Sequence, residues 1–290
     1  MGKKHILTDD AKWGYLLVAP TIIGLIVLNV YPFIQTLVLS FSTTHPFGIY
    51  EVTGIQNYEQ MFASKEFWKA TWNSIYFCIL TVPIGVFLSL LAAVLLNAKI
   101  KGKSAFRAIY FLPMVVAPAA IAMVWKWIFN AEYGIINQII GTKVSWLTTP
   151  GLVLPACAVV AIWSAVGYDA ILLLSGIQNI SKSYYEAASL DGASTFQIFR
   201  YITVPLLNPV IQFVVITSTI GGWQLFAEAQ MLVGTAGGIG KSGMTVVLYL
   251  YNQAFGNRQF GYGSAISWAL VVIIGFCSLI NWLLTRREVD

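Results

Sequence analysis

Long apolar stretches constrain the fold of this chain more than any other feature of its sequence. A membrane-spanning helix needs about 20 consecutive apolar residues, and six stretches are long enough. They cover residues 14–40, 71–97, 106–129, 151–177, 207–232 and 262–284. Charged residues make up only 10% of the 290, whereas a soluble domain carries about 25%. We therefore expect an all-α integral membrane protein in which residues 1–290 form a single domain of six transmembrane helices.

Lys and Arg residues are distributed unevenly between the two sides that six such spans would create. Cytoplasmic loops are enriched in these residues, so the richer side indicates the cytoplasm. That side has Lys3, Lys4, Lys12, Lys99, Lys101, Lys103, Arg107, Lys182, Arg200, Arg286 and Arg287. The other side has Lys65, Lys69, Lys126, Lys143, Lys241 and Arg258. We therefore expect both termini in the cytoplasm. The basic residues are scattered, so the net charge of +5 indicates topology and not nucleic acid binding.

The residue types that usually build metal sites and active sites are few and dispersed. Cys78, Cys157 and Cys277 lie far apart in apolar runs, and His5 and His45 are isolated. Without a C-x-x-C spacing or paired histidines, we expect neither a disulfide framework nor a metal site. The cysteines are expected to pack within the helices. No cluster of Asp, His, Cys or Ser indicates a catalytic centre, so we expect no catalytic residues.

A glycine-rich stretch, VGTAGGIGKSGMT at residues 233–245, resembles a phosphate-binding loop at first sight. Such a loop needs the pattern G-x-x-x-x-G-K-[ST] after a buried strand. Five residues before Gly240 the chain has Thr235 in place of the first glycine, and a predicted membrane helix precedes the stretch. We therefore expect a flexible external loop here, and no ATP hydrolysis by this chain itself.

The connection at residues 181–205, on the predicted cytoplasmic side, has more internal pattern than a simple loop needs. Ser183 and Glu186 have the S-x-x-E spacing of a capping box, in which the two side chains satisfy backbone N–H groups at a helix start. Gly192 follows an alanine-rich segment and can end a helix in a left-handed conformation. These residues predict a short helix that Gly192 terminates.

A second capping box, Ser194-x-x-Gln197, predicts a second helix directly after the glycine. That helix is expected to continue until Pro205 disturbs it as the next span begins. Aromatic and apolar residues in both helices suit docking into a groove on a partner protein. They also suit a helix that lies on the lipid headgroups, and the residue pattern alone leaves both possibilities open.

This connection resembles the EAA loop of bacterial ABC importer permeases. The family pattern is E-A-A, three residues, G, nine residues, and then I-x-L-P. Here Glu186-Ala187-Ala188 is followed after three residues by Gly192, and nine further residues lead to Ile202. Val204 stands in place of the usual Leu before Pro205.

In that family the loop forms a coupling helix seated in a cleft of a separate cytosolic ATPase dimer. The resemblance implies that Glu186 makes the polar contact to the ATPase and that Gly192 provides the turn. Ala187 and Ala188 would lie against the ATPase surface, and Asp191 and Ala193 would belong to the same coupling segment. The resemblance also implies that ATP and Mg²⁺ bind to the partner ATPase, with no cofactor on this chain.

Further segments are similar to the carbohydrate-uptake branch of the family. APTIIGLIVLNVYPFIQTLVLSF resembles its first span, GIQNYEQMF its first external loop, and FGYGSAIS the entry into its last span. After span five the branch usually has a turn like T-G-G-G-P, where this chain has VGTAGGIGKSGMT. The resemblance implies a sugar importer in the bacterial inner or plasma membrane. Its other parts would be a second homologous permease subunit, the ATPase dimer and an extracytoplasmic sugar-binding protein.

Spans four and five line the passage in sugar permeases, and here they carry polar and small residues. Ionisable groups at membrane depth usually face a cavity, and glycines leave room for a ligand. The candidate pathway residues are Ser164, Tyr168, Asp169, Ser218, Gly222, Gln224 and Leu225. Small residues at such spacings also serve helix packing in lipid, and the sequence leaves both roles open.

An ion-gradient-driven secondary transporter is the alternative from a different class. Such a protein needs coupling groups near the membrane midplane and often contains inverted repeats. Asp169 is a lone candidate for such a group, and no clear repeat is visible. The capped EAA segment has no role in that alternative, so the importer interpretation accounts for more of the sequence.

Overall fold

A computed structural model describes the backbone of residues 9–44, 50–98 and 102–286. Within these ranges five helices are long and apolar enough to cross a membrane. The number becomes six if two helices that meet at a sharp bend are taken as one span. Several residues of the sequence predictions lie outside the described ranges, namely Lys3, Lys4, His5, His45, Lys99, Lys101 and Arg287.

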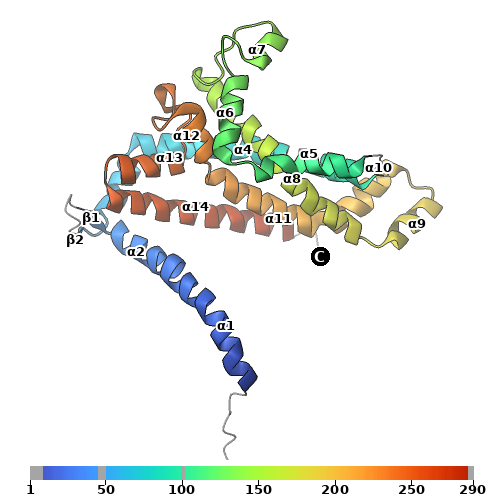
Figure 1. Ribbon diagram of the computed structural model, residues 1–290, viewed down its shortest axis with the longest axis horizontal. Helices are drawn as coiled ribbons and strands as arrows, with labels where there is room; N and C mark the ends of the chain where they lie inside the picture. Colours follow the sequence, from blue (N-terminus) through green and yellow to red (C-terminus); the bar gives the residue numbers. More distant parts are fainter. Residues whose placement is uncertain (1–8, 45–49, 99–101, 287–290) are drawn as a thin grey trace, which may run out of the picture. The chain divides into compact units, whose positions relative to one another are not determined.

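Figure 1 labels both strands and most of the helices, which are numbered in chain order. They are α1 (Asp9–Leu25), the π-helical turn η1 (Ile26–Val30), α2 (Tyr31–Ser40), β1 (Ser42–Thr44), β2 (Tyr50–Val52), α3 (Gln56–Ala63), α4 (Lys65–Asn97), α5 (Lys103–Val115), α6 (Pro118–Ile128), α7 (Ile135–Ile140), α8 (Pro150–Asn179), α9 (Lys182–Leu190), α10 (Thr195–Ile198), the π-helical turn η2 (Phe199–Thr203), α11 (Val204–Trp223), α12 (Ala227–Val233), the 3₁₀ turn η3 (Ile239–Lys241), α13 (Val246–Tyr251), the π-helical turn η4 (Asn252–Gly256) and α14 (Phe260–Arg286).

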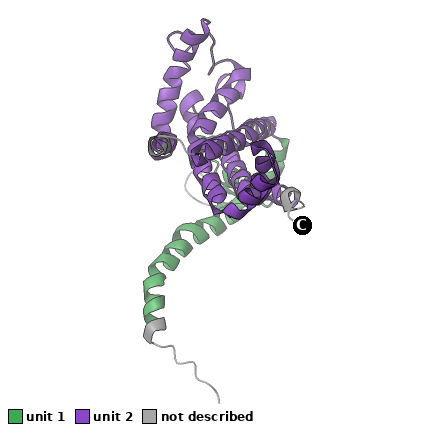
Figure 2. Cartoon of the chain, turned by 90° about the vertical axis from the view of Figure 1, so that its right-hand side faces the viewer, with its two compact units in different colours: residues 1–63, 253–268 green, residues 64–252, 269–290 purple. Residues whose placement is uncertain are grey.

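The chain divides into two compact units, which Figure 2 colours separately. Unit 1 comprises Met1–Ala63 and Gln253–Trp268, and unit 2 comprises Ser64–Asn252 and Ala269–Asp290. Both units draw on segments that are distant in the sequence, because α14 begins in unit 1 and ends in unit 2.

Unit 1 is organised around the end of its first helical run. That run, Lys12–Ser40, is a candidate span, and no residue in its most apolar window is buried. Strands β1 and β2 then pair as an antiparallel hairpin, with Thr43 opposite Glu51. The buried Asn57 amide donates to the carbonyl oxygens of Ser40 (3.0 Å) and Ser42 (2.9 Å). These bonds satisfy backbone acceptors at the helix end and attach α3 to it.

Unit 2 has a core where α4, α8 and α11 meet. Its buried residues are Ala93, Leu96, Leu173, Leu174, Ile177, Leu207 and Val214. Each helix contributes aliphatic side chains one or two turns apart, so the three helices bury one face each against the others. This arrangement brings the two spans with candidate pathway residues, α8 and α11, into the same bundle.

The predicted spans correspond to the observed helices most closely at the first, second, fourth and sixth positions. There the candidate spans are Lys12–Ser40, Lys65–Asn97, Pro150–Asn179 and Phe260–Leu283. The predicted third span, 106–129, is instead a pair of helices, Ala108–Val115 and Pro118–Ile128, that are bent by 108°. Proline disfavours helical geometry in the residue before it, and Ala117 has ψ of 133°. This region is therefore not one straight helix.

The predicted fifth span, 207–232, differs from the structure at both ends. Thr195–Trp223 forms one candidate span that passes through η2 and into α11. The helical run continues past Pro205, but it is π-helical over Phe199–Thr203, directly before the proline, and regular α-helix begins again at Val204. After Trp223 the backbone leaves helical geometry, and α12 is a separate helix.

Candidate functional site

The connection between α8 and α11 contains the two short helices that the sequence predicts. Helix α9 begins two residues earlier than expected, because the N-cap is Ser181, whose Oγ accepts a hydrogen bond from the Ser183 backbone N–H at 3.4 Å. Ser183 is itself helical, so the predicted capping box between Ser183 and Glu186 is wrong. Both serines can cap a helix, and the first one in the chain does so here.

Gly192 ends α9 in the left-handed conformation that the sequence predicts, with φ of +76°. The Gly192 N–H donates to the Ser189 carbonyl (3.2 Å), and the Ala193 N–H donates to the Ala188 carbonyl (3.0 Å). These two bonds constitute a Schellman motif, which satisfies the last carbonyls of a helix. Glycine at this position avoids the steric cost that a side chain meets at positive φ.

Helix α10 begins with the capping box that the sequence predicts. The Gln197 backbone N–H donates to Ser194 Oγ at 3.3 Å, and the Ser194 N–H donates to Gln197 Oε1 at 2.7 Å. Tyr185 Oη and Thr203 Oγ1 lie 3.4 Å apart and connect α9 to the start of the next span. The segment is therefore a defined helix–turn–helix and not an irregular loop.

The predicted coupling residues lie together on the surface of this helix–turn–helix. Glu186, Ala187, Asp191 and Gly192 are exposed, and no residue of α9 or α10 is buried. The Leu190 side chain is 89% exposed. Asp191, Gly192, Ala193, Gln197, Ile198, Tyr201 and Ile202 line a hollow of about 300 Å³ beside the turn. Exposed apolar side chains around a hollow are typical of a surface that a partner covers.

Two of the predicted pathway residues, Asp169 and Ser218, meet inside the α8–α11 contact. The Asp169 side chain is buried, and Ser218 Oγ lies 3.4 Å from Asp169 Oδ2. Ser164 Oγ instead donates to the Val160 carbonyl of its own helix at 2.9 Å. Tyr168 is 41% exposed. Asp169 and Ser218 therefore form the one polar contact between predicted pathway residues in the described part of the chain.

The other three predicted pathway residues, all near the end of α11, have different surroundings. A Cβ atom placed on Gly222 would lie 2.8 Å from Cys78 Sγ, so this glycine permits close approach of α4. Leu225 is buried, whereas Gln224 is exposed. Gly222 and Leu225 thus serve helix packing within this chain, and Gln224 keeps its amide available on the surface.

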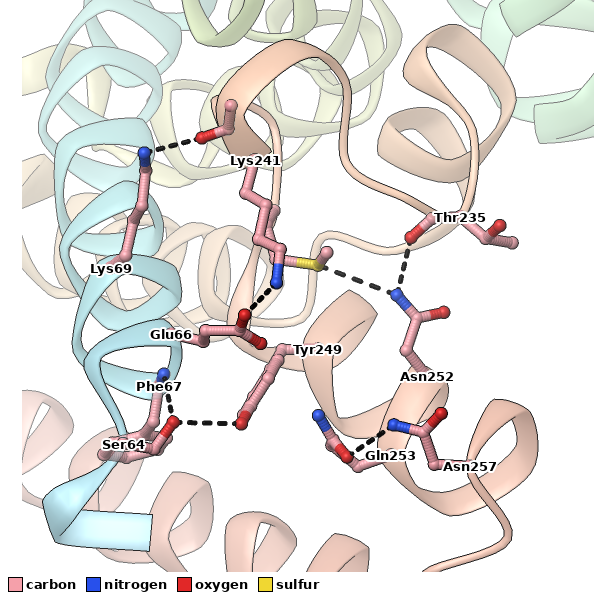
Figure 3. A network of polar contacts seen from close by, with 12 residues as sticks. Ser64, Glu66, Phe67, Lys69, Thr235, Lys241, Tyr249, Asn252, Gln253 and Asn257 are labelled. Carbon is pink, nitrogen blue, oxygen red and sulfur yellow. Dashed lines mark hydrogen bonds and ion pairs between the residues drawn. The ribbon is translucent and has the colours of Figure 1, made fainter.

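The glycine-rich stretch between α12 and α13 is held by side chains of α4, as Figure 3 shows. Lys69 Nζ donates to the Gly240 carbonyl at 2.6 Å. The Asn73 amide donates to the carbonyls of Lys241 (3.0 Å) and Met244 (2.9 Å), and Lys241 forms an ion pair with Glu66. These contacts replace the flexible loop of the sequence prediction with a segment attached to α4 at several points. The element directly before the stretch is helix α12, whereas a phosphate-binding loop follows a buried strand.

Sequence reasoning missed the α4 residues that hold this segment. Glu66, Lys69 and Asn73 recur at intervals of three and four residues, which places them on one face of α4. That spacing indicates a polar face on the first turns of α4. The partners of these residues lie about 170 positions later in the chain, and local patterns do not identify contacts at such separations.

The two connections lie at opposite ends of the helices of unit 2. Figure 1 shows α9 and α10 at one end of α8 and α11, and α12 and α13 at the other. A connection with exposed apolar helices and a connection packed on α4 therefore face opposite sides of the predicted membrane.

Comparison with known proteins identifies the family to which this architecture belongs. Residues 85–287 match the family described as binding-protein-dependent transport system inner membrane component. The chain is 34% identical to the lactose transport system permease protein of Rhizobium radiobacter, over 95% of this chain and 94% of that protein. It is 35% identical to the arabinooligosaccharides transport system permease protein of Halalkalibacterium halodurans, over 93% of this chain and 87% of that one.

A solved structure shows the same fold at lower sequence identity. It is a bacterial alginate ABC transporter in complex with a periplasmic protein bound to an alginate pentasaccharide. The TM-score is 0.84 at 22% identity, with 99% of each chain covered. The family match and the full-length relatives together establish that this chain belongs to the binding-protein-dependent transport system inner membrane components, the permease family of ABC importers.

Proposed function

We propose that this chain is one permease subunit of an ATP-driven importer for a sugar, and that it forms half of the translocation pathway. The observation that carries the proposal is the exposed helix–turn–helix of α9 and α10 in a chain whose full-length relatives are sugar permease proteins. A second homologous permease would complete the pathway. A dimeric ATPase would bind ATP and Mg²⁺, and this chain would hold no cofactor.

The α9–α10 segment would transmit ATP binding to the spans. Glu186 would make a polar contact with the ATPase, and Ala187 and Ala188 would lie against its surface. The turn at Gly192, with Asp191 and Ala193, would fix the angle between the two short helices. Helix α10 continues without a break into the span that ends at Trp223, so a displacement of the segment would move that span directly. ATP shifts the transporter between conformations only through its different affinity for each of them.

Membrane orientation follows from the same proposal. The α9–α10 segment must face the cytoplasm to reach the ATPase, and six spans then place both termini on that side. The bend between α5 and α6 would belong to the third span. The segment attached to α4 would face outward, toward an extracytoplasmic sugar-binding protein. This orientation agrees with the distribution of Lys and Arg in the sequence.

The substrate class is a mono- or oligosaccharide. Relatives are described as permeases for lactose and for arabinooligosaccharides, and the similar solved alginate transporter is in complex with a periplasmic protein bound to an alginate pentasaccharide. Tyr168 and Gln224 are the exposed members of the predicted pathway set and would contact the sugar directly. Asp169 and Ser218 would contribute polar groups where α8 meets α11, while Ser164 would remain bonded to its own helix.

Transport assays in vesicles test this proposal against the secondary-transporter alternative. The gene would be deleted in its native host, and uptake of labelled lactose, maltose and arabinooligosaccharides would be measured with and without the restored gene. Membrane vesicles from the restored strain would then be loaded with ATP, or given an ion gradient without ATP. We expect uptake that requires both ATP and the binding protein and that persists when a protonophore collapses the gradient. Uptake driven by the gradient alone would contradict the proposal.

A further inference from the structure

Helix α11 ends in a break of the backbone that lies among buried residues. Trp223 is its last helical residue, and the Gln224 N–H still donates to two carbonyls of the last turn, each at 3.1 Å. Phe226 has φ of −137° and ψ of −62°, which is outside helical geometry. The buried residue Leu225 therefore belongs neither to α11 nor to α12. Its carbonyl needs a hydrogen-bond donor from elsewhere, because a buried carbonyl without one is costly.

Thr245 supplies that donor. Its Oγ1 donates to the Leu225 carbonyl at 2.7 Å. The same oxygen accepts a hydrogen bond from the Leu248 N–H at 3.3 Å, because Thr245 is the N-cap of α13. The Thr245 side chain is fully buried. One hydroxyl therefore connects the end of α11 to the start of α13.

Helix α4 holds the backbone on both sides of Thr245. The Asn73 amide donates at 2.9 Å to the carbonyl of Met244, the residue before Thr245. Ser74 Oγ accepts a hydrogen bond at 3.0 Å from the N–H of Val246, the residue after it. All four of these residues are buried. Because both neighbouring peptide groups are bonded to α4, Thr245 presents its hydroxyl to the end of α11 from a fixed position.

Gln224 lies directly before the residue that Thr245 holds. The Gln224 side chain is exposed, whereas its backbone is anchored at two points. Its N–H is bonded to α11, and one residue later the Leu225 carbonyl is bonded to Thr245. Helix α11 and Thr245 together therefore determine the direction in which the Gln224 amide points.

We infer that Thr245 is a positioning residue for Gln224 in sugar translocation. The inference rests on the proposed function, in which Gln224 contacts the sugar. Thr245 does not contact the sugar itself, because its side chain is fully buried. Its hydroxyl holds the backbone at Leu225 and thereby fixes where the Gln224 amide meets the sugar hydroxyls. Such positioning matters, since a displacement of about 1 Å can cost about 100-fold in rate.

A double-mutant cycle in the complete importer tests this role. Uptake of labelled lactose, maltose and arabinooligosaccharides would be measured in vesicles loaded with ATP, for Thr245→Val, Gln224→Ala and the double variant. Valine has the shape of threonine without the hydroxyl, whereas Thr245→Ser keeps the hydroxyl. Thr235→Val is the matched control, because Thr235 is exposed and lies in the same connection. Ser74→Ala, which removes the bond to Val246, is the second variant in case Thr245→Val does not assemble.

Thr245→Val should lower uptake of the imported sugar roughly tenfold, which corresponds to the loss of about one hydrogen bond. Thr245→Ser should restore uptake to within about twofold of the unmodified importer, and Thr235→Val should leave it unchanged. In the Gln224→Ala background Thr245→Val should have no further effect, because residues that act through one another are not additive.

Hydrogen exchange of the same importer separates a failure of this inference from a failure of the proposed function. Thr245→Val should accelerate exchange at the amides of residues 224–226, whereas Thr245→Ser and Thr235→Val should not. Unchanged exchange in Thr245→Val would overturn the inference alone. Absence of ATP-dependent uptake of all three sugars by the unmodified importer would contradict the proposed function, and the inference with it.

Two uptake results would also overturn the inference. An equal loss of uptake from Thr245→Val with and without Gln224→Ala would show that Thr245 serves folding and does not act through Gln224. Failure of Thr245→Ser to restore uptake would show that the hydroxyl is not the group that matters.

Discussion

Two connections in unit 2 differ in whether their side chains are exposed or are bonded to other helices of the unit. The α8–α11 connection leaves its apolar residues exposed, and Leu190 on α9 is the clearest case. The α12–α13 connection directs its polar groups toward α4, where Lys69 and Asn73 hold the backbone around Lys241. The first connection leaves apolar side chains without partners in the described part of the chain, whereas the second is bonded to α4. The two connections thus differ in whether their side chains have contacts within this chain.

The largest effect on this comparison is expected from Leu190→Ala in α9. Anchor residues of a protein interface each contribute about 2 kcal/mol or more, which is roughly 30-fold in affinity. The affinity of the ATPase for membranes that contain this chain and the second permease should fall by about that factor, as measured by titration with labelled ATPase.

The matched control for Leu190→Ala is Ile139→Ala in α7. Ile139 is 79% exposed and lies outside the coupling segment. Its substitution should leave ATPase affinity unchanged. Equal losses in the two variants would remove the distinction between α9 and other exposed helices.

A smaller, local effect is expected from Asn73→Ala in α4. The Asn73 side chain is buried and donates to two carbonyls, so its removal leaves those acceptors unsatisfied at a cost of about 1–3 kcal/mol. Hydrogen exchange should accelerate between residues 240 and 246, with ATPase affinity unchanged.

Asn252→Ala is the comparison for that variant. Asn252 donates to the Thr235 carbonyl at 2.6 Å in a more exposed setting, where water can replace the lost donor. It should accelerate exchange near Thr235 by a smaller factor. If Asn73→Ala left exchange unchanged, the attachment of this segment to α4 would not exist in the membrane.

The smallest effect is expected from the ion pair between Glu66 and Lys241. Their side chains are 49% and 39% exposed, and such exposed pairs contribute about 0.2–1 kcal/mol. A double-mutant cycle with Glu66→Gln and Lys241→Gln should give a coupling energy in that range that declines as salt is added. A coupling that does not change with salt would indicate that the pair is buried by a partner.

Local sequence signals predicted most of the α8–α11 connection. Gly192, Ser194 and Gln197 act over three or four residues, and the structure confirms the turn and the second capping box. The start of α9 was misassigned because Ser181 and Ser183 both suit an N-cap. Pro118 indicates the bend between α5 and α6. The prediction nevertheless took residues 106–129 as one span, because the apolar run is long enough to cross a membrane.

The α12–α13 connection could not be predicted in the same way. Glycines at residues 234–243 suggest flexibility, and the contacts that restrain them come from α4 at a separation of about 170 residues. Lys241 even adopts φ of +58°, which is unfavourable for a residue with a side chain and is maintained here by its bonds to Asn73 and Glu66. The predicted pathway residue Gly222 is a similar case, because its burial depends on how closely α4 approaches it at Cys78.

The most direct test of the central claim is ATPase retention by a Gly192→Asp variant. Gly141→Asp is its control, since Gly141 ends α7 with φ of +75° against +76° at Gly192, and a Cβ atom meets no atom within 4 Å at either position. The two variants therefore introduce the same charge and the same backbone strain at different surfaces. The tagged importer would be purified in mild detergent, and bound ATPase would be quantified by mass spectrometry. Loss of the ATPase from Gly192→Asp alone is the predicted result, and retention by both variants, or loss from both, would contradict a coupling role for α9 and α10.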